Sequence, residues 1–318
     1  MYYLGIDLGG TNIAVGIVDE NYQIIARATS RTKTESPEQV ADAMAETARE
    51  ALKNAELTLD DVPWIGVGSP GTVNKATGII EFANNLPFRN TPMVQMLSER
   101  LDGKQVLMEN DANAAAYGEY MAGALKGADN AIAITLGTGV GGGVIINHQI
   151  YSGSNFAGAE LGHTVIVVDG RPCTCGRNGC WETYASATGL IRTTKEHMAN
   201  APKDSPLWTL VGGDINQVTG RTAFDAMRQG DPIGSEIVEE YIHYLSEGIV
   251  DMVNVFQPDI LCIGGGISNE RDTLLNPVRA FVEKQQYAMN SAKKTVICRA
   301  ELGNDAGIIG AALLGKEA

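Results

Sequence analysis

Short apolar runs interrupted by glycine and polar residues open the chain and predict three strands, Tyr2–Leu8, Ile13–Asp19 and Tyr22–Ala28. The residues between them, Gly9-Gly10-Thr11-Asn12 and Asp19-Glu20-Asn21, are typical of tight turns. The N-terminal segment is therefore predicted to be strand, glycine-rich turn, strand, polar turn, strand.

After these strands, the spacing of the apolar residues changes to that of a helix. Ser36-Pro37-Glu38-Gln39 combines a capping-box serine with a proline at the first helical position. Apolar residues from Val40 to Ala55 then recur at helical spacing and predict an amphipathic helix. The other elements predicted in this half are strands at Val62–Gly68 and Lys104–Met108, a helix capped by Thr91-Pro92, and an Ala-rich helix over Ala112–Ala124 with Asp111 as its N-cap.

The opening pattern recurs near the middle of the chain. The run from Ala131 to Ile150 is again strand, glycine-rich turn, strand, polar turn and strand, with Leu136-Gly137 in the place of Leu8-Gly9. Two glycine-rich hairpins can be alike by coincidence, but the position favours a chain of two related halves that meet near residue 120.

The second half is predicted to contain more helix. Helical periodicity covers several segments, a strand leads into three consecutive glycines, and an apolar helix rich in Gly and Ala ends the chain. The predicted helices are Glu182–Ala199, Arg221–Gln229, Pro232–Phe256, one after Gly264–Gly266, and Asn304–Leu314; the predicted strands are Asp259–Ile263 and Thr295–Arg299.

Composition narrows the class of protein. The 318 residues are 44% hydrophobic and 19% charged, which is typical of a globular protein. The net charge of −14 argues against nucleic acid or an anionic membrane as a partner. No secretory signal or membrane-spanning run is present, and five cysteines, an odd number, are poor material for disulfides. We therefore expect a cytoplasmic protein.

The two matching glycine turns, Gly9-Gly10-Thr11 and Gly137-Thr138-Gly139, predict a polyphosphate site. Without Cβ atoms, a hairpin backbone can approach a phosphate closely and direct N–H groups at it. The third cluster, Gly264–Gly266, would contact a purine or a phosphate, or is only a tight strand-to-helix turn. Asp7, next to the first turn, would hold Mg²⁺ through water, or form hydrogen bonds at the strand end.

The run Glu109-Asn110-Asp111 follows a predicted strand at the place where an α/β sheet binds its ligands. Asp111 as a helix N-cap is the simpler interpretation. The functional interpretation is that this carboxylate takes a proton from an alcohol that the neighbouring amide of Asn110 orients.

One imidazole and three thiols lie close together in the sequence, and they are the most specific signal in the chain. His163, Cys173, Cys175 and Cys180 suit a closed tetrahedral Zn²⁺ site, and glycines between them allow the loop to wrap round one ion. Four protein ligands leave no open position, so the zinc is predicted to be structural. Glu160 and Glu182 flank the cluster, either as surface residues or with their directions fixed by the zinc loop.

Taken together, these motifs resemble the ROK sugar kinases of the actin/hexokinase/Hsp70 superfamily, and among them the bacterial glucokinases. The resemblance covers nearly the whole chain, in order. It is carried by DLGGTN from Asp7, SPGTV from Ser69, NNLPF from Asn84, ENDANAAAYGE from Glu109, LGTGVGGG from Leu136, GAELGH from Gly158, CTCGRNGCWE from Cys173 and IGGGIS from Ile263.

The resemblance implies a role for each matching residue. Asp111 would be the general base that deprotonates the 6-hydroxyl of a hexose. His163 would bind zinc with one ring nitrogen and sugar with the other. The other sugar-binding residues would be Gly71, Asn85, Asn110, Glu160 and Glu182, and the residues that bind ATP and Mg²⁺ would be Asp7, Gly9, Gly10, Thr11, Asn12, Thr138, Gly139, Gly264, Gly265 and Gly266.

The implied fold is α/β, a two-domain actin-like ATPase of duplicated ribonuclease H-like halves with an interdomain cleft. A small domain would comprise residues 1–118 and 303–318, and a large domain residues 119–302. The implied reaction is the ATP-dependent conversion of a hexose to its 6-phosphate, a step of glycolysis and carbohydrate metabolism for D-glucose. The family also suggests a homodimer.

Three alternatives stay open at this point. Another sugar, such as fructose, mannose, allose, N-acetylglucosamine or N-acetylmannosamine, suits the same residues. Sugar-sensing repressors resemble these kinases but carry an added helix-turn-helix domain, whereas here the DLGGTN strand begins at the first residues. An actin-like filament ATPase would have no use for the zinc loop or for Asn110-Asp111.

Overall fold

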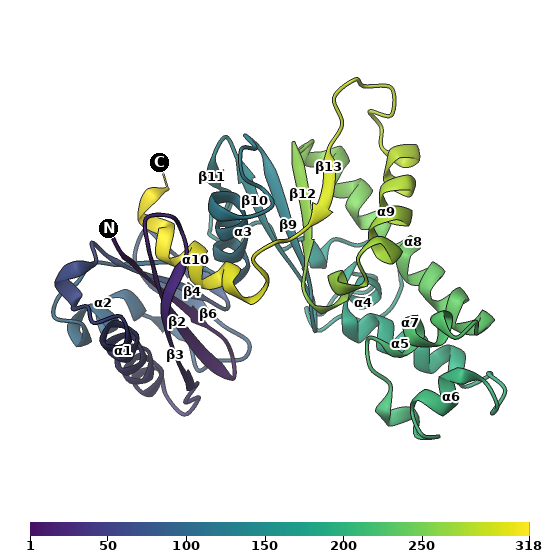
Figure 1. Ribbon diagram of the computed structural model, residues 1–318, viewed down its shortest axis with the longest axis horizontal. Coiled ribbons are helices and arrows are strands. Elements are labelled where there is room, and N and C mark those ends of the chain that lie inside the picture. Colours follow the sequence, from purple (N-terminus) through teal and green to yellow (C-terminus); the bar gives the residue numbers. More distant parts are fainter. Residues whose placement is uncertain (318) are drawn as a thin grey trace. The chain divides into compact units, whose positions relative to one another are not determined.

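The computed structural model describes residues 1–317, which form two compact units (Figure 1). Unit 1 comprises Met1–Ala133, Gly142–Ala159 and the C-terminal segment from Ala300, and unit 2 comprises Ile134–Gly141 and Glu160–Arg299. The predicted domain limits, residues 1–118 with 303–318 and residues 119–302, stay a prediction, and residue 318 lies outside the described chain.

Two five-stranded sheets share one strand order. The first has the order β3-β2-β1-β4-β8, and the second has the order β11-β10-β9-β12-β13. In each, three consecutive strands form one side and later strands complete the other. This repetition confirms the mixed α/β fold of duplicated halves. The strands are β1 Tyr3–Leu8, β2 Asn12–Val18, β3 Ile24–Arg31, β4 Ile65–Ser69, β8 Val106–Asn110, β9 Ala131–Leu136, β10 Val140–Ile146, β11 Gln149–Ile150, β12 Ile260–Gly264 and β13 Val296–Arg299.

Helices cover both faces of the first sheet. The helix α1 (Pro37–Asn54) packs on β2 and β3, and α10 (Ala306–Leu313) packs on β1 and β4. Alternation along β1 explains the two faces, because Leu4 and Ile6 join the apolar core with α1, while a Cβ atom on Gly5 would collide with the carbonyl of Ile308 in α10. Glycine therefore lets α10 approach the sheet at backbone distance.

Parallel pairing brings polar residues to one edge of the first sheet. The strand β1 pairs antiparallel with β2 and parallel with β4, and β4 pairs parallel with β8. Since the carboxyl ends of parallel strands meet at one edge, Asp7 on β1 and Asn110 at the end of β8 belong to the same edge. The helix α3 (Asp111–Ala122) begins there directly after β8.

The sequence did not predict the three-stranded sheet of β5 (Thr72–Asn74), β6 (Ile79–Phe82) and β7 (Arg89–Thr91). Its strands are short and carry mixed apolar and polar residues, so no period stands out. The hairpin of β5 and β6 lies in unit 1 and includes Gly71 just before β5 and Lys75 in its turn. The remaining helix of this part is α2, Met93–Arg100.

In unit 2 the long helix α8 (Pro232–Phe256) packs against four other helices. Its predicted limits are confirmed, and Asp231 caps it by accepting a hydrogen bond from the Ile233 N–H at 2.9 Å. The helices around it are α4 Glu182–Ala185, α5 Ala187–Met198, α7 Thr222–Arg228 and α9 Asp272–Gln285, with α6 Pro206–Leu210 beside α7.

Two predictions about helix ends were wrong. The segment Glu182–Ala199 is two helices, because Ser186 is extended and its side chain caps α5 by accepting a hydrogen bond from the Gly189 N–H at 3.0 Å. The N-cap of α3 is Asn110 rather than Asp111.

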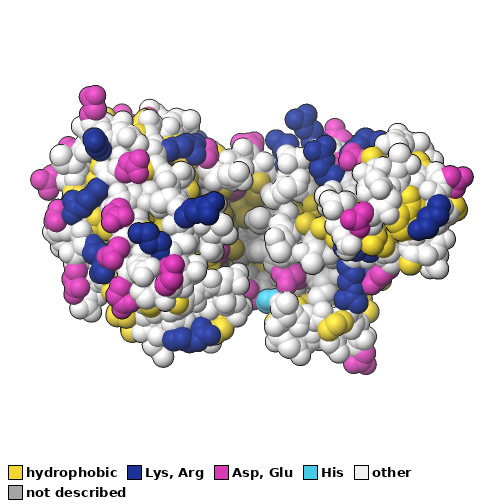
Figure 2. Space-filling model, turned by 90° about the horizontal axis from the view of Figure 1, so that it is seen from below, with side chains coloured by type: hydrophobic (Ala, Val, Ile, Leu, Met, Phe, Trp, Pro, Cys, Tyr) yellow, Lys and Arg dark blue, Asp and Glu magenta, His cyan; other side chains and the backbone are white. Residues whose placement is uncertain are grey.

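Among the described residues, none of the helices combines the length and the apolar character that a membrane span requires. On the face drawn in Figure 2, acidic and basic side chains are interspersed.

Candidate active site and metal centre

The turn between β1 and β2 is ordered by backbone bonds and exposes three of the predicted residues. The Gly9 N–H donates to the Asn12 carbonyl at 2.9 Å, and the Thr32 hydroxyl donates to the Gly9 carbonyl at 2.7 Å. Gly10, Thr11 and Asn12 are exposed at its tip. A rigid turn with an exposed glycine is suited to contact with a phosphate.

Asp7 lies half-buried on β1 beside this turn. Burial, with a smaller contribution from the charge of Asp111, raises the pKa of Asp7 to about 6. A Cβ atom on Gly307 at the start of α10 would lie 2.7 Å from Asp7 Oδ2. A carboxylate that is costly to ionise here gains from a cation next to it, which fits the predicted Mg²⁺ role.

The corner between β8 and α3 holds Asn110 by both ends of its amide. Asn110 Oδ1 accepts hydrogen bonds from the N–H groups of Ala112 at 2.9 Å and Asn113 at 3.2 Å, and Nδ2 donates to the Gly71 carbonyl at 3.1 Å. Asn110 therefore caps α3 and ties this corner to the β5–β6 hairpin. Gly71 has φ +96°, where a side chain would also collide with the Phe82 carbonyl.

Asp111 is the first residue of α3 and its carboxylate is half-buried. Burial raises the pKa of Asp111, and hydrogen bonds from the Ala112 N–H and the Asn110 side chain only partly oppose this rise. The carboxylate also raises the pKa of Asp7, so the two acids are electrostatically coupled. A carboxyl group with a raised pKa is a better proton acceptor than an ordinary surface aspartate.

Asn85 is exposed and belongs to the same group of residues. A Cβ atom on Gly10 would lie 3.6 Å from Asn85 Cβ, so the turn after β1 and the segment after β6 are close neighbours. Unit 1 thus brings together one part of the predicted set: Asp7, Gly9, Gly10, Thr11, Asn12, Gly71, Asn85, Asn110 and Asp111.

A buried carboxylate behind this corner was missed in the sequence. Glu109 Oε1 accepts hydrogen bonds from the Asn110 N–H at 2.9 Å and from Asn113 Nδ2 at 3.1 Å. Its Oε2 accepts one from the Ser152 hydroxyl at 3.1 Å and forms an ion pair with Lys75 Nζ at 3.3 Å. Glu109 is thus fully paired although it is almost entirely buried.

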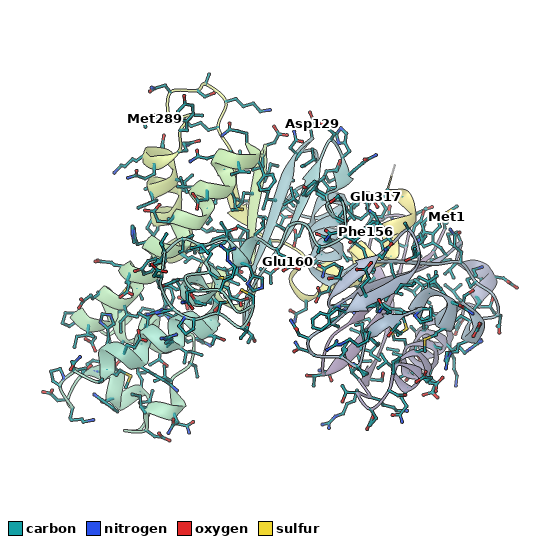
Figure 3. All side chains as sticks on the ribbon, turned by 180° about the vertical axis from the view of Figure 1, so that it is seen from behind. Met1, Asp129, Phe156, Glu160, Met289 and Glu317 are labelled. Carbon is teal, nitrogen blue, oxygen red and sulfur yellow. The ribbon has the colours of Figure 1, made fainter. Side chains whose placement is uncertain are left out.

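Lys75 links this carboxylate to the C-terminal segment. Its ammonium lies 3.3 Å from Glu317 Oε2, and Glu317, which follows α10 (Figure 3), accepts a hydrogen bond from the Ile150 N–H at 3.0 Å. Burial lowers the pKa of Lys75, but the charges of Glu109 and Glu317 outweigh it and raise that pKa overall. No sequence motif connects these residues, because Lys75 and Glu317 are 242 positions apart.

In unit 2, the turn between β9 and β10 is held by the segment that follows the cysteine loop. The Ala187 N–H donates to the Gly137 carbonyl at 2.9 Å, and the Thr188 hydroxyl donates to the Thr138 carbonyl at 2.7 Å. The Val140 N–H donates to Glu182 Oε2 at 3.0 Å. Thr138 is exposed at the tip, as the polyphosphate prediction requires.

The third glycine cluster lies after β12 in unit 2. Gly265 has φ +82°, and a Cβ atom there would collide with the backbone of Leu136 at the end of β9. The Ser268 hydroxyl donates to the Gly265 carbonyl at 2.7 Å. Gly265 and Gly266 are exposed, so a flat ligand can rest on this backbone. A 3-10 helix, Gly266–Glu270, and then α9 follow.

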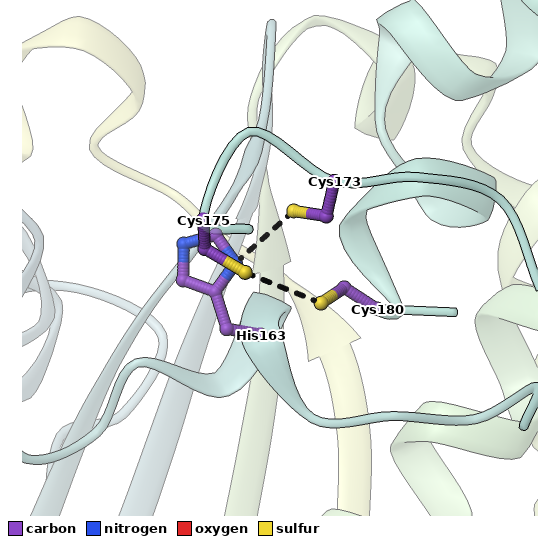
Figure 4. Close-up of side chains that lie close together, drawn as sticks. All are labelled: His163, Cys173, Cys175 and Cys180. Atoms are coloured by element: carbon purple, nitrogen blue, oxygen red, sulfur yellow. Dashed lines mark hydrogen bonds between the residues drawn. The ribbon is translucent and has the colours of Figure 1, made fainter. Parts of the chain in front are cut away.

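His163, Cys173, Cys175 and Cys180 meet in space, as their spacing predicts (Figure 4). Their ligand atoms all lie within 4.8 Å of one another. Cys175 Sγ is 3.6 Å from Cys180 Sγ, and Cys173 Sγ is 3.6 Å from His163 Nδ1. A tetrahedral ion with bonds of about 2.0–2.3 Å sets its ligands about 3.3–3.8 Å apart, so these two spacings are compatible with Zn²⁺.

The two glutamates that flank the cluster differ in their surroundings. Glu160 is exposed just before a 3-10 helix, Leu161–His163, and its carbonyl accepts a hydrogen bond from the His163 N–H at 3.1 Å. Glu182 is half-buried at the start of α4, with its Oε1 4.0 Å from Cys173 Sγ. Unit 2 thus brings Glu182 together with both the cysteine cluster and the glycine turn after β9.

The chain is similar to known proteins over almost its whole length. A profile of the ROK family matches residues 3–318. A glucokinase of Thermotoga maritima is 38% identical over 317 residues, covering 99% of this chain and 97% of its own. A glucokinase of Streptomyces coelicolor is 37% identical over 315 residues, with the same coverage.

Solved structures give the same result. A ROK family glucokinase from Streptomyces griseus, crystallised in complex with glucose and AMPPNP, superposes with a TM-score of 0.83 at 35% sequence identity. The match covers 100% of both chains. The whole described fold is therefore shared with that protein.

Proposed function

The chain belongs to the ROK family, and on this premise we propose that it is a sugar kinase that transfers the γ-phosphoryl group of ATP to the 6-hydroxyl of a hexose, first of all D-glucose. The relatives named glucokinase and the neighbour that holds glucose and AMPPNP support this choice. The observation that carries the proposal is Asp111, a carboxylate with a raised pKa at a strand end, electrostatically coupled to Asp7 beside an exposed glycine turn.

The proposed base is Asp111. An alcohol is a weak nucleophile, so a carboxylate in hydrogen-bond reach of the 6-hydroxyl would accept its proton as the bond to phosphorus forms. Asn110 and Asn85 would orient neighbouring hydroxyls, and the Gly71 backbone would approach the ring. The bonds that hold the Asn110 amide keep this group ready without a ligand.

Phosphoryl transfer depends mostly on positioning and on neutralising charge. The turn residues Gly9, Gly10, Thr11 and Asn12 in unit 1, and Thr138 and Gly139 in unit 2, would hold the phosphates of ATP by backbone and hydroxyl donors. Asp7 would hold Mg²⁺, which offsets the phosphate charge. The backbone of Gly264, Gly265 and Gly266 would contact the adenosine.

A neutral sugar is best selected by many paired hydrogen bonds. Glu160 and Glu182 would accept them from ring hydroxyls, and His163 would donate or accept with Nε2. Zinc, bound by His163 Nδ1 and the three cysteine thiolates, would supply a rigid closure of the loop and fix the ring of His163. A sugar that lacks one of these hydroxyls would leave a buried group unpaired, at a cost of about 1–3 kcal/mol.

One assay tests the proposal. ADP release is measured over a panel of hexoses and N-acetylhexosamines with ATP, and the product is identified by NMR. We expect glucose 6-phosphate, with the highest kcat/KM for D-glucose. A tenfold preference for another sugar would replace glucose but leave the kinase, whereas no phosphorylation of any sugar would overturn the proposal. A cytoplasmic location, a role in glycolysis and a homodimer stay predictions.

A further inference from the structure

Glu182 faces two different features of unit 2. One carboxylate oxygen, Oε2, accepts the hydrogen bond of the Val140 N–H at 3.0 Å, in the turn proposed to hold ATP phosphates. The other, Oε1, lies 4.0 Å from Cys173 Sγ. The carboxylate therefore touches the glycine turn and the cysteine loop at the same time.

Gly139 shows how closely the carboxylate fits the turn. A Cβ atom at this position would collide with Glu182 Oε2, so a side chain here would displace the carboxylate from the turn. The same short segment supplies two more bonds to the turn, from Ala187 to the Gly137 carbonyl and from Thr188 to the Thr138 carbonyl. The shape of the turn is thus set largely by residues 182–188.

The backbone of Glu182 is itself well anchored. Trp181, directly before it, is fully buried, and its indole N–H donates to the Tyr244 carbonyl at 3.0 Å. A Cβ atom on Gly248 of α8 would collide with the Trp181 ring, so the indole packs against that helix at backbone distance. With its backbone fixed, Glu182 can change only by side-chain rotation.

We propose that Glu182 is a positioning residue that couples the sugar site to the nucleotide site. This rests on the proposed function, in which Oε1 accepts a hydrogen bond from a sugar hydroxyl. A sugar bound to Oε1 restricts the side chain to the rotamer that keeps Oε2 on the Val140 N–H. Because the side chain loses its rotational freedom once, whichever ligand binds second no longer has to restrict it, and the two ligands bind cooperatively.

Linkage requires this coupling to be reciprocal. Glucose should tighten the binding of an ATP analogue, and the analogue should tighten glucose by the same factor. A coupling of this kind favours the phosphate turn in its ordered form when a sugar is present, and it disfavours transfer of the phosphoryl group to water when no sugar is bound.

Titration calorimetry with AMPPNP and Mg²⁺, with and without saturating glucose, tests the inference. In the wild type we expect glucose to lower the Kd of AMPPNP about fivefold or more. In Glu182→Ala the sugar-free Kd should rise several-fold, and the effect of glucose should disappear at a glucose concentration shown to saturate the variant. Equal coupling in wild type and Glu182→Ala would overturn the inference.

Three further variants separate the role of Glu182 from those of its neighbours. Glu160→Gln should weaken glucose but keep the coupling at saturation, since the proposed function assigns Glu160 to the sugar alone. Loss of coupling there as well would contradict a special role for Glu182. Thr188→Val removes another bond to the turn and should weaken AMPPNP without changing the coupling factor. Glu182→Gln replaces one of the two acceptor oxygens by an NH2 group, so the side chain can no longer accept at both positions. It should reduce the coupling, and it serves if the alanine variant does not fold.

The sugar-free arm distinguishes this inference from the proposed function. If glucose neither binds nor is phosphorylated by the wild type, the proposed substrate is wrong, yet Glu182→Ala should still weaken AMPPNP. If glucose is phosphorylated but AMPPNP binds Glu182→Ala as tightly as wild type, the proposed function stands and the inference is overturned.

Discussion

The β8–α3 corner of unit 1 and the cysteine loop of unit 2 both concentrate reactive side chains, but different interactions hold them. At the corner, four hydrogen-bond or ionic partners surround Glu109, two of them from distant segments, and three bonds hold the Asn110 amide. In the loop, the thiols of Cys175 and Cys180 lie against each other, and burial with these thiol contacts raises the pKa of Cys180 to about 12.

The difference is between a site complete in itself and a site that needs an ion. Protein groups alone orient Asp111, so its geometry should persist without any ligand. Three thiolates repel one another once they form, and a divalent cation removes that cost. The corner should therefore tolerate a chelator, and the loop should not.

At the β8–α3 corner, Asp111→Asn should cause the largest loss of activity. An amide cannot accept the proton of the 6-hydroxyl, and general-base catalysis contributes about 10²–10⁴-fold, so kcat should fall at least about 100-fold. AMPPNP affinity should stay within about twofold of wild type, because the amide keeps the shape of the side chain.

Asp272→Asn is the matched control, since Asp272 is also the first residue of a helix, α9, and is exposed. It should leave kcat unchanged. Turnover of Asp111→Asn above a few per cent of wild type would exclude Asp111 as the base.

Zinc removal tests the other side of the comparison. Metal analysis should find about one zinc per chain, and Cys175→Ser should lose it together with most of the affinity for glucose. Cys262→Ser, which alters a buried thiol of β12, should keep the metal. Hydrogen exchange should show the 163–182 loop opening after chelation, while the amides of α3 keep their protection. If the wild-type protein held no zinc, or if both regions lost protection equally, the loop would not differ from the corner in its need for an ion.

The two regions also differ in how far the sequence could predict them. The cluster was predicted completely, because its cysteines lie within one loop and thiolate–imidazole sets have few other uses. Asp111 was singled out from its place after a strand, and its role as the base stays a prediction. Glu109 was quoted only as part of a motif, since Lys75, Ser152 and Glu317 reach it through tertiary pairing that no local pattern encodes.

The secondary structure also contains elements that local sequence patterns predicted and elements that they did not. The helix Pro232–Phe256 was predicted to the residue because a proline at its first position and a long apolar period agree. The break at Ser186 was missed, since apolar spacing continues across it while the serine side chain caps a new helix. The sheet of β5–β7 was missed because its strands are too short to show a period.

The pH dependence of the free energy of unfolding should report the raised pKa of Asp7, which lies at the same sheet edge as the corner. The pKa of Asp7 is raised from 3.8 to about 6, so the folded protein binds this proton more tightly than the unfolded chain. The stability contributed by Asp7 is therefore full below pH 3.8 and falls as the pH rises to about 6, by at most about 3 kcal/mol.

Asp7→Asn has no such titration, so chemical denaturation across pH 4–7 should show the free energy of unfolding of wild type falling relative to the variant. A difference that is flat, or that rises with pH, would mean that Asp7 is already ionised at low pH and is stabilised by its surroundings. Asp305→Asn, at an exposed ion pair with Arg27, controls for general charge effects.

Lys75→Met should have the smallest effect, on stability rather than on chemistry. It leaves the buried charge of Glu109 with hydrogen bonds but without its cation, which costs several kcal/mol for a fully buried pair. Here the lysine side chain is 33% exposed, so water screens part of the interaction and we expect a loss of about 1–2 kcal/mol in the free energy of unfolding.

The control is Lys126→Met, at an exposed lysine of unit 1, which should change the free energy of unfolding by less than about 0.5 kcal/mol. The double variant Lys75→Met/Glu109→Gln should recover part of the loss, because it removes the unpaired charge as well. If Lys75→Met were as stable as wild type, the corner would be held by its hydrogen bonds alone.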